Sequence, residues 1–349
     1  MSFMLKWTGY LKTKFKFWIN PLSHFLPADT FFVFLVRYVF FFSIKRKPMK
    51  KLLSFFLPIL FLANGNVVKA QSTELPLWPN GIKNNPVKYT EEKVRSGDIN
   101  QSSLSQKNRV FSQVSEPTYV LIQPKKGTAN GIAVVICPGG GFRDVWFDRE
   151  GVDFAMWLAN KGITSLVLKY RTFNSDAESF SLNREIYNAE VLADAKQSIN
   201  ILRSRADELN IDKNKIGIGG FSAGGALSLY AALNIFEEDL PEYARFKENT
   251  APNFVFPIYP GISDEVFKAV KQKENIPPMF LINGAEDKVT PALKCIQLYT
   301  ALLEKNVPAE LHIYAKGNHG FDSGIGRGFG VASWQDSFIY WLKDLKFLE

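Results

Sequence analysis

Short apolar segments alternate with longer amphipathic segments from about residue 119 to the end of the chain. The apolar segments have the continuous hydrophobicity of strands buried on both faces, and the longer ones carry apolar residues at helical spacing. We predict strands at 119–123, 131–137, 163–170, 215–221, 253–259, 278–283 and 310–315, and helices at 151–160, 186–209, 223–234, 291–305 and 331–345. This alternation predicts an α/β fold with a mainly parallel central sheet and helices on both faces.

The domain defined by this alternation covers residues 107–349. Residues 71–106 are polar and irregular, with no sustained hydrophobic period. Such a pattern is typical of extended chain that takes its structure from a neighbouring surface. We therefore predict an N-terminal arm that wraps the domain.

The segment Met49–Ala70 has the pattern of a secretory signal peptide. Two lysines precede the apolar run Leu52–Ala63, and Val68 and Ala70 fit positions −3 and −1 of a cleavage site. The run is too short for a comfortable membrane span. We expect export to the periplasm or the extracellular space, a mature N-terminus at Gln71, and no stable membrane association after cleavage.

Residues 1–48 stand in front of this signal peptide, which normally begins at the start methionine. We hypothesise that translation starts at Met49 and that residues 1–48 are an over-extended gene model. The alternative is a transmembrane or interfacial anchor at Phe31–Ile44, a second apolar run that Arg37 interrupts.

The net charge of +8 comes from the first 70 residues, which hold eleven Lys or Arg and one acid. The remaining 31 basic and 33 acidic residues leave 71–349 nearly neutral, which argues against a nucleic-acid partner. Cys137 and Cys295, the only cysteines, fall in a predicted strand and a predicted helix, where we expect buried free thiols. No Cys/His cluster has metal-ligand spacing, so we expect neither a metal nor a cofactor.

The sharpest chemical signal is Gly220-Phe221-Ser222-Ala223-Gly224, between a predicted strand and a predicted helix. In a G-x-S-x-G elbow the serine occupies a strained strand-to-helix turn, and the flanking glycines avoid clashes with neighbouring elements. A plain tight turn is the alternative for a five-residue pattern. The strand before it and the helix after it favour Ser222 as a nucleophile.

A serine nucleophile needs a general base. Residues 71–349 contain two histidines, His312 and His319. His312 lies inside a predicted strand, where packing explains it. His319 follows the last predicted strand in a loop flanked by Gly317 and Gly320, at the sheet edge where such folds present their ligand-binding loops. We predict that His319 is the base.

The imidazole needs an acid that orients it. Strand 278–283 leads into a loop with two candidates, Glu286 and Asp287, for each of which a solvated loop acid is the alternative. The order Ser222, Asp287, His319 along the chain is the order expected for this kind of site.

Three consecutive glycines, Gly139 to Gly141, directly follow the buried strand 131–137. They let the backbone turn sharply and aim N–H groups at an oxyanion. We predict an oxyanion hole formed by the amides of Gly140, Gly141 and Ala223. The candidates to line the substrate pocket, for which ordinary loop packing is the alternative, are Phe142, Arg143, Trp146 and Tyr259.

Taken together, residues 107–349 resemble the α/β-hydrolase superfamily. Within it the chain is similar to bacterial acetylxylan- or feruloyl-esterase-like enzymes (BD-FAE-like), which are related to the hormone-sensitive-lipase group. The motifs that carry the resemblance are LWPNG (77–81), CPGGGF (137–142), LKYR (168–171), GFSAGG (220–225), IYP (258–260), NGAEDKVTP (283–291) and GNHGF (317–321). In the G-x-x-D-x-x-V-P pattern of the family, the aspartate falls on Asp287, which we prefer over Glu286. Pro138 departs from the lipase group, which has His there, and this leaves the pair of hole donors open.

The resemblance implies a secreted serine esterase that hydrolyses short acyl esters, acetyl or feruloyl, on plant polysaccharide or oligosaccharide. A prolyl-oligopeptidase-like peptidase shares the triad, but it usually carries a large propeller domain that has no counterpart in this sequence. A non-catalytic binding module on the same fold typically lacks the Ser or the His, and both are present here.

Overall fold

A computed structural model describes residues 73–98, 103–173 and 184–349. The predicted signal peptide at Met49–Ala70, residues 1–48 and the alternative anchor at Phe31–Ile44 lie outside these residues. Within them, no helix combines the length and the apolar character needed to cross a membrane.

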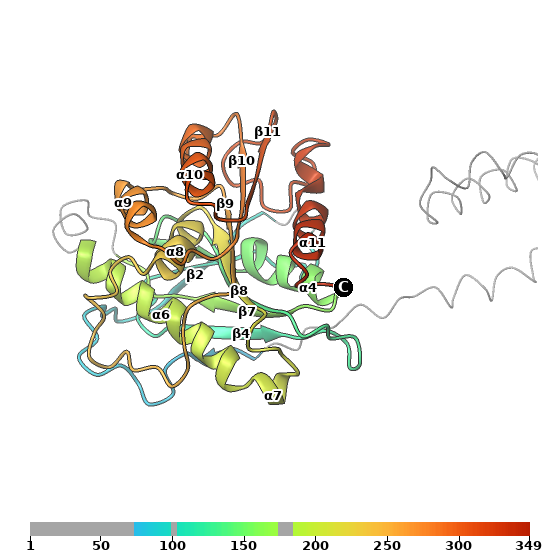
Figure 1. Cartoon of the computed structure of the whole chain (residues 1–349). Helices are drawn as coiled ribbons and strands as arrows, with labels where there is room; N and C mark the ends of the chain where they lie inside the picture. Colours follow the sequence, from blue (N-terminus) through green and yellow to red (C-terminus); the bar gives the residue numbers. More distant parts are fainter. Residues whose placement is uncertain (1–72, 99–102, 174–183) are drawn as a thin grey trace, which may run out of the picture. The chain divides into compact units, whose positions relative to one another are not determined.

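The core of the described chain is an eight-stranded sheet in the order β1-β4-β7-β5-β8-β9-β10-β11 (Figure 1). All strands from β7 to β11 run parallel, whereas β4 is antiparallel to β7 and β1 is antiparallel to β4. The predicted mainly parallel sheet is therefore confirmed. The strands are β1 (Leu75–Pro76), β4 (Thr118–Ile122), β5 (Ala133–Cys137), β7 (Thr164–Lys169), β8 (Ile216–Phe221), β9 (Phe254–Ile258), β10 (Met279–Gly284) and β11 (Ala309–Tyr314).

Helices cover both faces of this sheet. On one face α6 packs against α8, α8 against α9 and α9 against α10, while α4 and α11 cover the other face (Figure 1). Phe154 of α4 packs directly on Trp334 and Phe338 of α11. The helices are η1 (a π-helix, Asp148–Val152), α4 (Asp153–Ala159), α6 (Arg184–Ser204), α7 (Ala206–Leu209), α8 (Ala223–Leu233), α9 (Asp264–Gln272), α10 (Ala292–Glu304), η2 (Val331–Ser333) and α11 (Trp334–Asp344).

The N-terminal arm differs from its prediction as irregular chain. Its first residues form β1, which pairs with β4 at the edge of the large sheet. Its later residues form β2 (Lys93–Ser96), which pairs with β3 (Arg109–Ser112). Strand β3 pairs in turn with β6 (Asp144–Trp146), so the arm builds a second, three-stranded sheet. These strands are only two to four residues long, which is too short for a hydrophobic period to be recognised.

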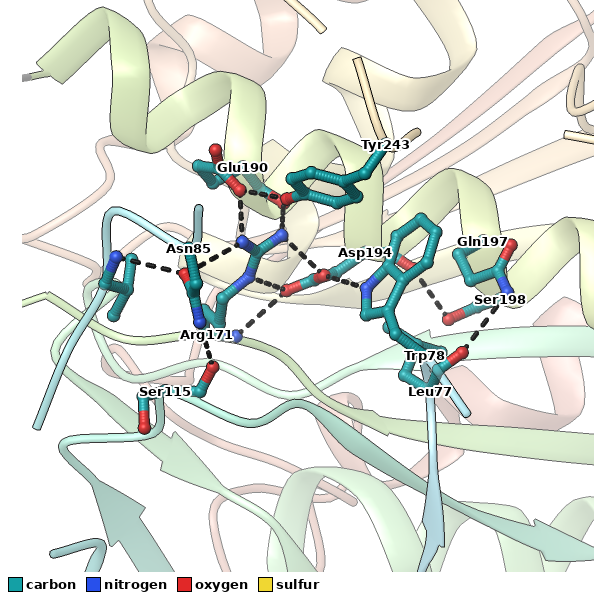
Figure 2. Close-up of polar contacts among 11 residues, drawn as sticks. Leu77, Trp78, Asn85, Ser115, Arg171, Glu190, Asp194, Gln197, Ser198 and Tyr243 are labelled. Atoms are coloured by element: carbon teal, nitrogen blue, oxygen red, sulfur yellow. Dashed lines mark hydrogen bonds and ion pairs between the residues drawn. The ribbon is translucent and has the colours of Figure 1, made fainter. Parts of the chain in front are cut away.

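A buried ionic cluster ties the arm to the domain (Figure 2). Arg171, just beyond β7, has a fully buried side chain, and its Nε and Nη2 donate to the two carboxylate oxygens of Asp194 on α6 at 2.9 and 2.7 Å. Glu190, one turn earlier on α6, pairs with the same guanidinium. From the arm, Trp78 Nε1 donates to Asp194 Oδ1 at 2.9 Å, and Asn85 Oδ1 accepts from Arg171 Nη1 at 3.4 Å. Because buried charges need such partners, the cluster fixes the arm, α6 and the end of β7 to one another.

Both cysteines are buried and unpaired, as predicted. Cys137 ends β5, and burial raises the pKa of its thiol far above the usual range. Cys295 lies on α10, where burial raises its thiol pKa to about 11. Neither thiol therefore has the thiolate character of a reactive cysteine.

Candidate active site

Ser222 stands at the turn between β8 and α8, with φ +52° and ψ −114°. Residues other than glycine rarely adopt these backbone angles, so the turn is strained. The packing around it requires glycine: a Cβ on Gly224 would lie 1.9 Å from the carbonyl oxygen of Cys137 on the neighbouring strand. The sequence pattern therefore produces the sharp elbow that its spacing predicts.

His319 lies next to this serine. Its Nε2 is 2.8 Å from Ser222 Oγ, across the gap between the elbow and the loop that follows β11. His312 has a different environment, since its Nε2 lies 2.5 Å from Glu310 Oε1 on its own strand. The structure thus brings together the two side chains proposed as nucleophile and base, and leaves His312 on the sheet edge.

Asp287 lies on the other side of the imidazole, with its Oδ2 2.8 Å from His319 Nδ1. Its carboxylate is fully buried, and Oδ1 accepts from the backbone N–H groups of Val289 and Thr290 at 2.8 and 2.9 Å. An ionised carboxylate can only accept, which places a proton on Nδ1 and leaves Nε2 free to accept from Ser222. Glu286, the other candidate acid, instead pairs with Lys316 at 2.5 Å.

Thr290 is a site residue that the sequence reasoning missed. Its Oγ1 lies 2.9 Å from Asp287 Oδ2, 3.2 Å from His319 Nδ1 and 3.1 Å from the carbonyl oxygen of Tyr259. One hydroxyl proton serves one acceptor at a time, so Thr290 bonds either the acid or the Tyr259 carbonyl. Its position three residues after Asp287 was the available signal, because a threonine there caps the turn that the aspartate begins.

The glycine loop after β5 turns sharply beside Ser222. Gly140 and Gly141 have φ of +138° and +65°, and the carbonyl of Gly140 accepts from the N–H of Asp144 at 2.9 Å. In the part of the chain that the structure describes, no acceptor bonds the amides of Gly140, Gly141 or Ala223. Backbone N–H groups without an internal acceptor are one requirement of an oxyanion hole.

Three of the four predicted pocket residues lie on or after this loop. Phe142 is half-buried with φ +60°, and Arg143 is exposed. Trp146 on β6 is half-buried between two cations, with the guanidinium groups of Arg95 and Arg149 at 5.1 and 4.9 Å from its ring. Phe142 and Arg143 therefore keep accessible surface beside the glycine loop, whereas two guanidinium groups lie over the Trp146 ring.

The prediction for Tyr259 as a pocket-lining residue is wrong. Its side chain is fully buried, and its hydroxyl donates to Glu150 Oε1 at 2.9 Å. The ring packs edge-on against His319 and Phe321, with centroids 5.2 and 4.5 Å apart. Tyr259 directly follows β9 and has a φ of +35°. Its ring lies in the protein interior, where it packs against the loop that carries His319.

The strand order, the antiparallel β4 and the serine elbow define an α/β-hydrolase. The crystal structure of an acetyl ester-xyloside bifunctional hydrolase from Caldicellulosiruptor lactoaceticus shares this fold, with a TM-score of 0.59 and 22% identity over 82% of this chain and 100% of that one. The family model BD-FAE matches residues 121–260, and the model of the prolyl oligopeptidase family matches residues 262–345. The chain therefore has the α/β-hydrolase fold, and its part from residue 121 to residue 260 resembles the BD-FAE family.

Two curated proteins resemble the chain in sequence. An acetylxylan esterase from Xylanibacter ruminicola is 29% identical over 249 residues, which are 62% of this chain and 46% of that protein. Endo-1,4-beta-xylanase B from Butyrivibrio fibrisolvens is 30% identical over 212 residues, 54% of this chain and 32% of that protein. The matched regions therefore span less than half of each relative's length.

Proposed function

We propose that the protein is a serine esterase that hydrolyses short acyl esters, with Ser222, His319 and Asp287 as its catalytic triad. The observation that carries this proposal is the continuous pair of 2.8 Å contacts from Ser222 Oγ through the imidazole to Asp287 Oδ2. A serine hydroxyl is a weak nucleophile until a base accepts its proton, and this geometry provides that base.

In the first half-reaction, Ser222 Oγ attacks the ester carbonyl carbon while His319 Nε2 takes the hydroxyl proton. Asp287 stabilises the imidazolium that forms. The amides of Gly140, Gly141 and Ala223 hold the oxyanion of the tetrahedral intermediate. The carbon–oxygen bond to the alcohol then breaks, and His319 gives its proton to the departing alcohol.

In the second half-reaction, water attacks the acyl group on Ser222. His319 takes a proton from the water, and the same amides stabilise the second oxyanion. Collapse of the intermediate breaks the bond to Ser222 Oγ, which regains its proton from the imidazolium. The products are the carboxylic acid and the free enzyme.

We propose acetyl or feruloyl groups on plant polysaccharide or oligosaccharide as the substrate class. The names of two similar proteins support the acetyl form, since one is an acetylxylan esterase and the other an acetyl ester-xyloside hydrolase. The imidazole of His319 is 22% exposed, so solvent and a carbohydrate alcohol can approach the base directly.

A peptidase of the prolyl-oligopeptidase type is the second candidate. The match of that family model to residues 262–345, which contain Asp287 and His319, favours it. Ser222 and the glycine loop lie instead within the BD-FAE match. Release of 4-nitroaniline from Gly-Pro-4-nitroanilide, at a rate comparable with ester hydrolysis, would support the peptidase.

We also propose that the protein is exported after cleavage of Met49–Ala70. The two lysines, the short apolar run and the small residue at the cleavage site support this. Mass spectrometry of the exported protein is expected to find an N-terminus at Gln71. Peptides from residues 1–48 in that protein would instead support the anchor at Phe31–Ile44.

Hydrolysis of 4-nitrophenyl acetate and butyrate by the purified protein, beside Ser222→Ala, tests the esterase. We expect turnover of the acetate that the substitution abolishes. Activity that survives in Ser222→Ala would remove this serine from its proposed role. If neither protein is active, labelling by a fluorophosphonate probe separates a narrow native substrate, which leaves Ser222 reactive, from a non-catalytic binding module.

A further inference from the structure

Glu150 is a buried carboxylate directly behind the glycine loop. It lies on η1 with 4% of its surface exposed. Its Oε2 accepts from the backbone N–H of Gly139 at 2.7 Å, and its Oε1 accepts from the hydroxyl of Tyr259 at 2.9 Å. Both carboxylate oxygens are therefore engaged, one with the oxyanion loop and the other with the residue under the histidine.

The contact with Gly139 lies against the nucleophile. A Cβ on Gly139 would be 2.6 Å from Glu150 Oε2 and 3.1 Å from Ser222 Cβ, so the residue has to be glycine for the carboxylate and the serine to close on it. The N–H of Gly139 points back to Glu150, and the next two amides are the ones without an acceptor in the described chain. The bond to Glu150 therefore anchors the start of the loop that carries these two N–H groups, and the bond from the Trp146 N–H to the Gly139 carbonyl at 3.0 Å holds the next peptide unit.

The contact with Tyr259 continues to the histidine loop. The Tyr259 hydroxyl accepts from the backbone N–H of Asp322 at 3.2 Å, three residues after His319. The tyrosine ring packs on the imidazole itself. One carboxylate thus holds the oxyanion loop directly and the base loop through a single side chain.

Two charged side chains, Arg149 and Asp322, surround the buried carboxyl of Glu150. Burial raises its pKa, while the neighbouring Arg149 opposes that rise. Arg149 forms an ion pair with Asp322 at 3.0 Å and donates from Nη2 to the carbonyl of Gly320 at 2.9 Å. Burial also raises the pKa of Asp322. Arg149 and Glu150, adjacent on η1, therefore both hold the loop that carries His319.

We propose that Glu150 is a positioning residue, which aligns the oxyanion loop and the histidine loop with each other through its bonds to Gly139 and Tyr259. This inference rests on the proposed esterase function. It assigns Glu150 no contact with the substrate. Without the acceptor for the Gly139 N–H, this peptide unit is held only through its carbonyl, which accepts from the Tyr170 hydroxyl at 2.7 Å, and the loop that carries the oxyanion donors can shift.

The expected effect is on the transition state rather than on substrate binding. A misplacement of about 1 Å costs on the order of 100-fold in rate, and loss of one oxyanion donor costs about 100- to 1000-fold. For Glu150→Ala we expect kcat for 4-nitrophenyl acetate to fall about 100-fold while KM changes less than about threefold. The inhibition constant of a trifluoromethyl ketone, which binds as an oxyanion, should rise in parallel.

The conservative variant Glu150→Gln keeps an acceptor for Gly139 and removes the charge. We expect it to restore most of the lost kcat, at least about tenfold over Glu150→Ala. Tyr259→Phe keeps the ring on His319 and removes only the hydroxyl, and kcat should fall about three- to tenfold with KM unchanged. This variant keeps the proposal testable if Glu150→Ala does not fold.

Asp148 supplies a matched control, since it is a fully buried carboxylate on the same π-helix that bonds Arg109 and not the site. Asp148→Asn should lower the melting temperature and leave kcat within about twofold. A wild-type kcat in Glu150→Ala or in Tyr259→Phe, or an equal fall in Asp148→Asn, would overturn the inference. If the wild-type protein hydrolyses no ester, the proposed function fails and the inference fails with it. If the wild-type protein is active and Glu150→Ala has the same kcat, only the inference fails.

Discussion

The Thr290 hydroxyl lies 2.9 Å from Asp287 Oδ2 and 3.2 Å from His319 Nδ1, at the junction of acid and base. The backbone N–H of Thr290 also bonds Asp287 Oδ1 at 2.9 Å. One residue therefore contacts both oxygens of the carboxylate and holds its plane toward the imidazole. The turn that follows Asp287 therefore orients the acid independently of its bond to the histidine.

Thr290→Val, which keeps the shape and removes the hydroxyl, should lower kcat about tenfold and leave KM nearly unchanged. The reason is that a hydrogen bond to a charged group contributes about 1.5–3 kcal/mol, and about 1.4 kcal/mol in the barrier is tenfold in rate. Steady-state kinetics on 4-nitrophenyl acetate measure this. A kcat equal to that of the wild type would show that the backbone bonds alone orient Asp287.

The two candidate acids should separate clearly by substitution. Asp287→Asn is expected to reduce kcat about 10⁴-fold, because the amide favours the wrong imidazole tautomer and cannot stabilise the imidazolium. Glu286→Gln changes only a surface pair with Lys316 and should leave kcat unchanged. A larger loss in Glu286→Gln than in Asp287→Asn would reverse the assignment.

The ionic cluster at Arg171, which binds the arm to the domain, should contribute strongly to the free energy of unfolding. Asp194→Ala removes the carboxylate that accepts from Arg171 Nε and Nη2 and also the partner of Trp78, so we expect a loss of about 3–5 kcal/mol in the free energy of unfolding. Urea denaturation measures it. The matched control is Glu208→Ala, which removes an exposed ion pair with Arg205 and should leave the unfolding midpoint almost unchanged.

Asp153 should make stability fall as pH rises in the mildly acidic range. Its pKa is raised above 3.8 by burial, although its Oδ1 accepts from the N–H of Ser105 at 2.7 Å. A raised pKa means that the folded state binds more protons than the unfolded state, so this contribution is complete below pH 3.8 and is lost as pH rises through the folded value.

Asp153→Asn keeps the acceptor and cannot ionise, so its stability relative to the wild type should increase from pH 4 upward and then level off. Unfolding free energies measured between about pH 3.5 and 7.5 check the sign. A difference that stays constant across the range would mean that the folded and unfolded pKa values coincide.

The repeating strand and helix pattern was predictable because burial on both faces imposes it directly on the sequence. The long helix predicted at 186–209 divides at Arg205 into α6 and α7, with Asn210 at φ +55° ending the second. Nothing in the apolar spacing signals that break. The short strands of the arm were also missed, since backbone pairing with distant partners decides them. Helix α9 was missed as well, although its buried Val266 and Val270 have helical spacing.

The three triad candidates were predictable because each follows a strand at the carboxyl edge of the sheet, so the topology itself gathers Ser222, Asp287 and His319. Glu150 and Thr290 could not be assigned in this way. Their functions depend on which atoms they face after folding, and the sequence offers only an acid on a helix and a threonine in a turn. Tyr259 shows the opposite error, because a residue at a strand end can still turn its ring beneath the site.

The small sheet of β2, β3 and β6 has a consequence for fusing this hydrolase to other modules. Strand β6 directly follows the oxyanion loop, β3 pairs with it, and β2 of the arm covers the outer edge of β3. A shortened protein that begins at residue 107 would lose β1 and β2 and expose the edge of β3 as a template for intermolecular strand pairing. A linker to a neighbouring module should therefore be joined ahead of β1. If it replaces β1 and β2, a loss of activity could result from aggregation and not from a defect in catalysis.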